Sequence, residues 1–122
     1  MALYQSLHCD VFAPRIGTGN PLAVILQADA LSTEQMQAIA DWMNLAETTF
    51  VLAPSVPEAD YRVRIFTTKK EIAFAGLPSI GTAHALLDAG LAAPRDGLLV
   101  QDGIAGKLPL MVTENGSAWY DP

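Results

Sequence analysis

Glu47 is the residue of this sequence whose type and surroundings best fit acid–base chemistry. It lies in NLAETTF (residues 44–50), among apolar and hydroxyl residues, where an expected helix gives way to an expected strand. A carboxyl group held beside apolar surface tends to have a raised pKa, which suits it to proton transfer. A capped or solvent-facing glutamate is the alternative, and composition alone favours that alternative.

The segment FAGLPSIGTAHALLDAG (residues 74–90) predicts a buried helix whose start suits an anion. Proline is favoured at the first helical position and glycine just past the last, so Pro78 and Gly90 delimit a helix over Pro78–Ala89. Its residues are apolar almost all round, as in a buried helix, and the free N–H groups of a first turn attract anions. A plain buried helix with a tight entry loop is the alternative.

The sulfur and imidazole groups predict no metal site. Cys9 is the only cysteine, which excludes an internal disulfide and a multi-cysteine metal site. It lies in the strand-like run LHCDVFA and is expected to be a buried, inert thiol. His84, inside the apolar helix, is expected to be a buried structural histidine, and His8 to lie near the edge of the first strand.

Composition indicates one domain and argues against several kinds of partner. The 122 residues suffice for one hydrophobic core, and the net charge of −6 comes without a basic stripe. Nucleic acid and membranes are therefore not expected as partners. The sequence shows no signal peptide and no long apolar run, so a cytoplasmic location is expected. The 51% share of hydrophobic residues suggests that a partner covers part of the surface.

The pattern after Leu31 predicts an amphipathic helix. Ser32 is its N-cap, Gln35 completes a capping box, and Asn44 marks its end. One apolar face repeats at helical spacing, through Met36, Ile39, Ala40 and Met43.

Alternating and β-branched runs predict strands before, between and after the two helices. The expected strands are 7–13, 22–26, 48–53, 61–67, 71–74, 97–102, 106–113 and a last one around 118–120. The fourth alternates cleanly, with Tyr61, Val63, Ile65 and Thr67 facing one way and Arg62, Arg64 and Phe66 the other. These elements predict an α/β (α+β) domain in which a curved, mostly antiparallel sheet wraps around the apolar helix, because that helix needs cover on all sides.

Four segments taken together resemble one family. They are, in chain order, GNPLAVI (19–25), NLAETTFVL (44–52), YRVRIFT (61–67) and FAGLPSIGTAHALLDAG (74–90). In this order they are similar to the PhzF-like family of phenazine biosynthesis, which shares its fold with diaminopimelate epimerase. The resemblance implies two similar domains with an active site in the cleft between them. Residues 1–122 would then form a single domain equivalent to the N-terminal half.

The resemblance also implies a chemistry and a set of site residues. Family members move a proton on a small carboxylate-bearing molecule without metal or organic cofactor, and their acid–base glutamate falls on Glu47. The family's A-G-H-P turn falls on residues 75–78 and makes Gly76, Pro78 and Ser79 substrate-binding candidates, and the G-N-P turn adds Asn20. On this resemblance a catalytic position becomes the preferred interpretation of Glu47.

Two departures from the family pattern affect the predicted activity. Leu77 replaces the histidine of A-G-H-P and cannot donate a hydrogen bond to a substrate. The chain also ends at Asp121–Pro122, near the point where family members enter their second domain, so it is expected to supply half of the usual cleft.

Three functions follow as alternatives. The first is an isomerase or epimerase half-enzyme that acts as a homodimer, with two Glu47 carboxyls in a shared cleft, or with a separately encoded second half. The second is a non-catalytic domain that binds a small carboxylate or serves as a partner subunit. The third is a folded remnant without activity.

Overall fold

The structure is a computed structural model that describes residues 3–12 and 15–120. The elements in chain order are β1 (Ser6–Val11), β2 (Asn20–Ile25), α1 (Thr33–Met43), β3 (Glu47–Leu52), β4 (Tyr61–Phe66), β5 (Glu71–Ile72), α2 (Gly76–Asp88), β6 (Leu98–Asp102), β7 (Leu108–Val112) and β8 (Ala118–Trp119). The predicted end of the first strand at Ala13 lies outside the described residues.

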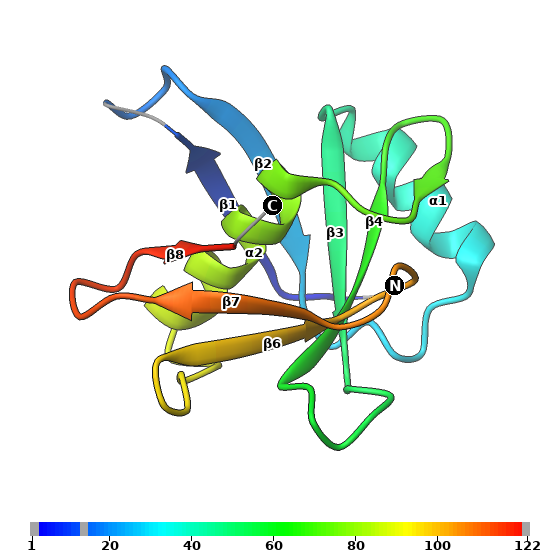
Figure 1. The fold of residues 1–122 in the computed structure, drawn as a ribbon. Coiled ribbons are helices and arrows are strands. Elements are labelled where there is room, and N and C mark those ends of the chain that lie inside the picture. Colours follow the sequence, from blue (N-terminus) through cyan, green and yellow to red (C-terminus); the bar gives the residue numbers. More distant parts are fainter. Residues whose placement is uncertain (1–2, 13–14, 121–122) are drawn as a thin grey trace.

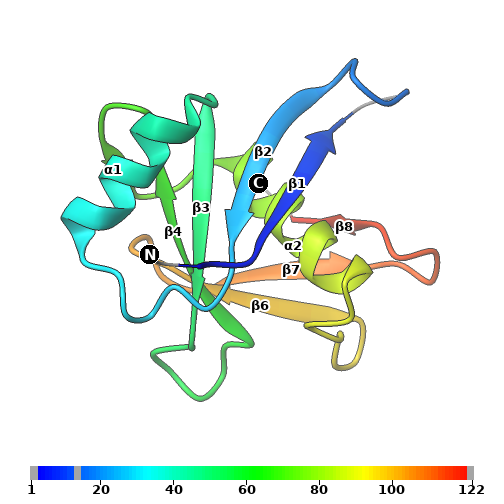
Figure 2. The same cartoon turned by 180° about the vertical axis from the view of Figure 1, so that it is seen from behind.

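All the strands that the structure describes belong to one curled sheet. Its order is β1-β2-β3-β4-β6-β7-β8, with β5 paired to β4, and among these described strands only the β2–β3 and β4–β6 pairings are parallel. Figures 1 and 2 show the sheet bending around α2, with β1 and β8 on either side of the helix. The predicted curved, mostly antiparallel sheet around the apolar helix is therefore confirmed.

Side-chain alternation divides the core into two parts. Val24, Val63 and Ile65 point to the concave face and pack against Leu86 of α2. Phe50, Phe66 and Ile25 point to the other face and pack under Met36 and Ala40 of α1. The predicted alternation of β4 is thus confirmed for Tyr61 to Phe66, because each of its faces has a helix to bury it.

The amphipathic helix has both of its predicted ends. Ser32 Oγ accepts from the Gln35 backbone N–H, and the Gln35 side chain accepts from the Ser32 N–H, which completes the capping box. Asn44 closes the helix in the left-handed conformation at φ 58°, which asparagine tolerates better than most residues. Local signals fixed this helix, and it covers the outer face of the sheet.

Two predicted boundaries need correction. The apolar helix begins at Gly76, so Pro78 is its third residue; proline is tolerated there because the first helical N–H groups have no partner within the helix. The predicted return strand over 71–74 is reduced to Glu71–Ile72, because the chain leaves β4 after two pairs to enter α2.

Two close contacts fix α2 against the concave face. The Thr49 and Thr82 hydroxyls, both fully buried, form a hydrogen bond of 2.8 Å. Gly81 packs so tightly that an added Cβ would lie 2.6 Å from Leu22 Cδ2 and 2.8 Å from Val11 Cγ2. These contacts fix the position of α2 along β1, β2 and β3. They therefore also fix which end of these strands lies near the first turn of α2.

Candidate functional site

Glu47 is the first residue of β3 and lies on the concave face. Strand residues two apart share a face, and Thr49 bonds to α2, so Glu47 faces the same side. It pairs in register with Leu22 of β2, which packs beneath α2. Glu47 is partly buried, and this burial raises the pKa of its carboxyl above the ordinary value. The environment that the sequence predicted for this carboxyl is therefore present.

The start of α2 lies at the same end of the sheet as Glu47. Ser79 precedes Thr82 by three residues, roughly 4.5 Å of helix, and Glu47 precedes Thr49 by roughly 7 Å of strand. Figures 1 and 2 both show α2 and β3 beginning in the upper half of the view and running downwards. Glu47 precedes Thr49 in β3, and the first turn of α2 precedes Thr82, so both lie on the same side of the Thr49–Thr82 contact, toward one end of the molecule.

The first two residues of α2, Gly76 and Leu77, present backbone donors and no polar side chain. The N-cap of the helix, Ala75, has no capping side chain, and Leu77 is a partly buried apolar residue. The N–H groups of Gly76 and Leu77 have no acceptor within residues 3–12 and 15–120. These two groups could receive an anionic ligand atom.

Pro78 and Ser79 are buried and shape this turn from within. The Ser79 hydroxyl donates to the Ala75 carbonyl at 2.8 Å and accepts from Gln101 Nε2 at 3.0 Å. Gln101 Oε1 in turn accepts from the Tyr61 hydroxyl at 3.3 Å. Both hydrogen-bonding directions of Ser79 are therefore used internally. The geometry gives Pro78 and Ser79 a supporting position under the helix start.

Asn20 begins β2 at the same end. It lies two residues before Leu22, on the same face, and its side-chain amide donates to the Val11 carbonyl at 3.4 Å. The residue is exposed, so the amide oxygen can contact a ligand from this position. The structure thus brings Asn20, Glu47 and Gly76 to one end of the concave face.

Tyr120 is a residue of this region that sequence reasoning did not select. It follows β8, and an added Cβ on Gly76 would clash with its hydroxyl. Its ring meets Phe74 edge to face, with centroids 5.7 Å apart and planes at 90°. No local signal indicates this neighbour, because only the curling of the sheet brings β8 beside α2.

The environment of His84 corrects one prediction. The residue is exposed rather than buried, although its role is structural: its Nε2 accepts a hydrogen bond of 3.1 Å from the Ala118 N–H. His84 lies on the strip of α2 left uncovered between β1 and β8, where a hollow of about 350 Å³ is lined by both edge strands. Cys9 lines the same hollow, and burial, followed by the nearby charge of Asp88, raises the pKa of its thiol.

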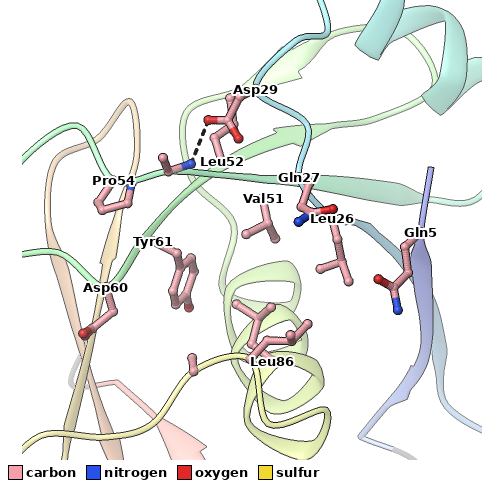
Figure 3. A pocket seen from close by; sticks show the side chains of 13 residues that line it. Gln5, Leu26, Gln27, Asp29, Val51, Leu52, Pro54, Asp60, Tyr61 and Leu86 are labelled. Carbon is pink, nitrogen blue, oxygen red and sulfur yellow. Dashed lines mark hydrogen bonds between the residues drawn. The ribbon is translucent and has the colours of Figure 1, made fainter. Parts of the chain in front are cut away.

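Another hollow lies at the opposite end of the sheet. It measures about 360 Å³, and Figure 3 shows Leu26, Val51 and Leu86 pointing into it, while Asp29 accepts a bond of 2.9 Å from the Ala53 N–H at its border. Its lining includes none of the predicted site residues. Glu47 and the start of α2 thus lie on an open part of the concave face, away from this hollow.

Within the described residues, no three His, Cys, Asp or Glu side chains gather as metal ligands would. No helix of this part of the chain is long and apolar enough to cross a membrane.

Solved structures show the same fold. A PhzF-family phenazine biosynthesis protein from Bacillus anthracis superposes with a TM-score of 0.80 and 38% sequence identity, covering 93% of this chain and 38% of that one. The fold is thus that of a diaminopimelate epimerase-like half, one curled sheet around one helix.

Sequence comparison identifies the family. Residues 9–119 match the family described as PhzC-PhzF, phenazine biosynthesis-like protein. Antisense-enhancing sequence 1 of Schizosaccharomyces pombe is 46% identical over 103 residues, which are 84% of this chain and 35% of that protein. A trans-2,3-dihydro-3-hydroxyanthranilate isomerase of Pseudomonas aeruginosa is 48% identical over 84 residues, 69% of this chain and 30% of the enzyme.

The chain belongs to the PhzC-PhzF family. It spans about a third of the length of the curated relatives it matches, and several of these are isomerases by name. The family and fold predicted from the four sequence segments are therefore confirmed.

Proposed function

We propose that this chain is one half of an isomerase in which Glu47 moves a proton on a small carboxylate-bearing substrate. The observation that carries the proposal is the partly buried Glu47 carboxyl, whose pKa is raised by burial, on the face and at the end where α2 begins. A carboxyl with a raised pKa exchanges a proton more readily near neutral pH than an ordinary glutamate. The family membership and the name of the Pseudomonas relative support the same chemistry.

The remaining site residues have distinct roles in this proposal. The N–H groups of Gly76 and Leu77 bind the substrate carboxylate at the positive end of the helix. Pro78 and Ser79 hold that turn in place from beneath, and Asn20 contacts the substrate from the start of β2. No metal or organic cofactor takes part in the proposed reaction.

A second half completes the site. On the family resemblance, residues 1–122 are equivalent to the N-terminal half of a two-domain member, and proton transfer from carbon needs a site that excludes water. We propose that a second copy of this chain, or another domain of the same fold, supplies the second half. In a two-fold homodimer, two Glu47 carboxyls would approach each other, and their repulsion would raise one pKa further.

Proton exchange into substrate tests the catalytic proposal. We expect the chain to catalyse deuterium incorporation from D2O into trans-2,3-dihydro-3-hydroxyanthranilate, followed by NMR, and we expect Glu47→Gln to lose this activity with its fold intact. Light scattering after size exclusion should give twice the 13.0 kDa mass of the chain if a homodimer forms. Exchange that is equally fast in Glu47→Gln would contradict the role of this residue.

A non-catalytic carboxylate-binding or partner subunit is the second candidate. Leu77 favours it, because the first turn of α2 then has backbone donors but no side chain that could assist a reacting group. Carboxylate binding that is unaffected by Glu47→Gln, together with no exchange activity, would support this function over the isomerase.

A further inference from the structure

Tyr120 places a hydroxyl group directly over the first turn of α2. An added Cβ on Gly76 would clash with the hydroxyl and lie 3.2 Å from Tyr120 Cζ. This hydroxyl has no hydrogen-bond partner within the described part of the chain, and it lies against Gly76, whose N–H group has no acceptor there either. The start of α2 therefore has a side-chain donor from β8 beside its own backbone donors.

The position of Tyr120 is fixed from two sides. Ala118 pairs with Val112 of β7 on one edge, and on the other its N–H donates to His84 Nε2 of α2 at 3.1 Å. Two residues later, the Tyr120 ring packs edge to face on Phe74, which precedes α2. Because β8 pairs with β7 at only two positions, the His84 and Phe74 contacts are what hold its end against the helix start.

Tyr120 also borders a hollow beside the helix start. The hollow measures about 300 Å³, and its lining combines apolar side chains such as Ile65 with the Gln101 amide and the Lys107 ammonium group. Ile65 pairs with Thr49, so this hollow lies one strand away from Glu47 and about two residues along the sheet. Gln101 is almost fully buried and supports Ser79 under the turn. A ligand held at the start of α2 thus has Tyr120 beside it, on the concave face where Glu47 also lies.

We propose that Tyr120 is a ligand-binding residue of this chain, whose hydroxyl donates to the substrate carboxylate at the start of α2 and supplies the side-chain donor that Leu77 cannot. The inference rests on the proposed function for the position of the carboxylate. A hydrogen bond to a charged acceptor is stronger than one between neutral groups, so the hydroxyl selects carboxylates over neutral analogues.

Benzoate and its neutral analogue benzamide test this assignment. Titration of the labelled chain, followed by amide NMR, should move the Gly76 and Leu77 resonances with benzoate. Tyr120→Phe keeps the ring and its contact with Phe74 but removes the hydroxyl, and should weaken benzoate binding about tenfold or more while benzamide binding stays the same. Tyr4→Phe is the matched control, because Tyr4 lines a separate hollow beside α1 and should change neither affinity.

A rescue variant and the activity assay sharpen the test. Leu77→His in the Tyr120→Phe background restores a donor at the same turn and should recover the lost affinity. Equal benzoate affinity in wild type and Tyr120→Phe, or no benzoate binding at the Gly76 and Leu77 amides, would overturn the inference. If exchange activity depends on Glu47 while Tyr120→Phe leaves the benzoate affinity unchanged, the proposed function stands and this inference fails. If Tyr120→Phe weakens benzoate binding but the chain has no exchange activity, this inference stands and the proposed function fails.

Discussion

Replacing Thr49 by valine should destabilise the protein, whereas the same replacement at the adjacent Thr48 should not. Both side chains are fully buried. Thr49 Oγ1 shares a hydrogen bond of 2.8 Å with Thr82 Oγ1, while Thr48 Oγ1, on the opposite face of β3, has no partner among the described residues. Two neighbouring threonines thus have the same burial and opposite hydrogen-bonding states.

The expected magnitudes follow from what each hydroxyl leaves behind. Valine has nearly the shape of threonine, so neither substitution opens a cavity. Thr49→Val leaves the Thr82 hydroxyl buried and unpaired, and should lower the free energy of unfolding by about 1–3 kcal/mol. Thr48→Val removes a hydroxyl that is already unpaired, and should leave the free energy of unfolding unchanged or raise it by about 1 kcal/mol. The double variant Thr49→Val, Thr82→Val should cost less than the two single variants added together.

Urea unfolding followed by circular dichroism measures these differences. The denaturant slope should stay the same in all variants, so that shifts in the midpoint report stability alone. Equal losses of unfolding free energy in Thr48→Val and Thr49→Val would refute the reasoning, because the Thr49–Thr82 hydrogen bond would then contribute nothing measurable to stability. The contact is of functional interest, since it sets α2 against β3 two residues from Glu47.

Three other substitutions test electrostatics and packing elsewhere in the domain and at Glu47. Burial raises the pKa of Glu47 in the folded state, so the free energy of unfolding of the wild type should fall as the pH rises from the ordinary glutamate pKa through the raised one. The urea midpoint of Glu47→Gln should therefore gain on that of the wild type as the pH rises through this range. The Ser55 hydroxyl and then Arg62 lower the pKa of Asp102, so its stabilisation is present above the ordinary aspartate value and lost as the pH falls through the lowered one. Asp102→Asn should accordingly cost about 1–3 kcal/mol at pH 7 and nothing in strong acid, by the same assay. Gly81→Ala should lower the free energy of unfolding by about 1 kcal/mol on balance, because the clash with Leu22 exceeds the gain in helix propensity. In urea unfolding, the double variant Gly81→Ala, Leu22→Ala should lose less free energy of unfolding than the two single variants added together.

The parts of the fold that depend on local signals were predictable. The capping box at Ser32, the left-handed end at Asn44 and the alternation of β4 are each determined by residues within a few positions of one another. The apolar helix was predictable for a related reason, since a helix without a polar face must be covered. Where the neighbours of an element decided its extent, as at the shortened β5, prediction was wrong.

The sequence proposed members for the candidate site but did not indicate their geometry. Glu47 and Gly76 were selected from surroundings and family resemblance, and the structure places both at one end of the concave face. Ser79 is buried and His84 is exposed because of which side of α2 packs against the sheet. The residue types alone do not indicate that side. Tyr120 gave no signal because its partners, Phe74 and Gly76, lie far from it in the sequence.

The sequence by itself determined the family and the two helices and proposed Glu47 as the acid–base residue, because periodicity, capping and motif order act over short distances. The tertiary structure decided where the candidate residues lie. Curling the sheet around α2 brings β8 beside the helix start and sets Glu47 on the same face, since both edges of the sheet must cover one apolar helix. That packing also supplies a tyrosine hydroxyl at the turn where Leu77 has none.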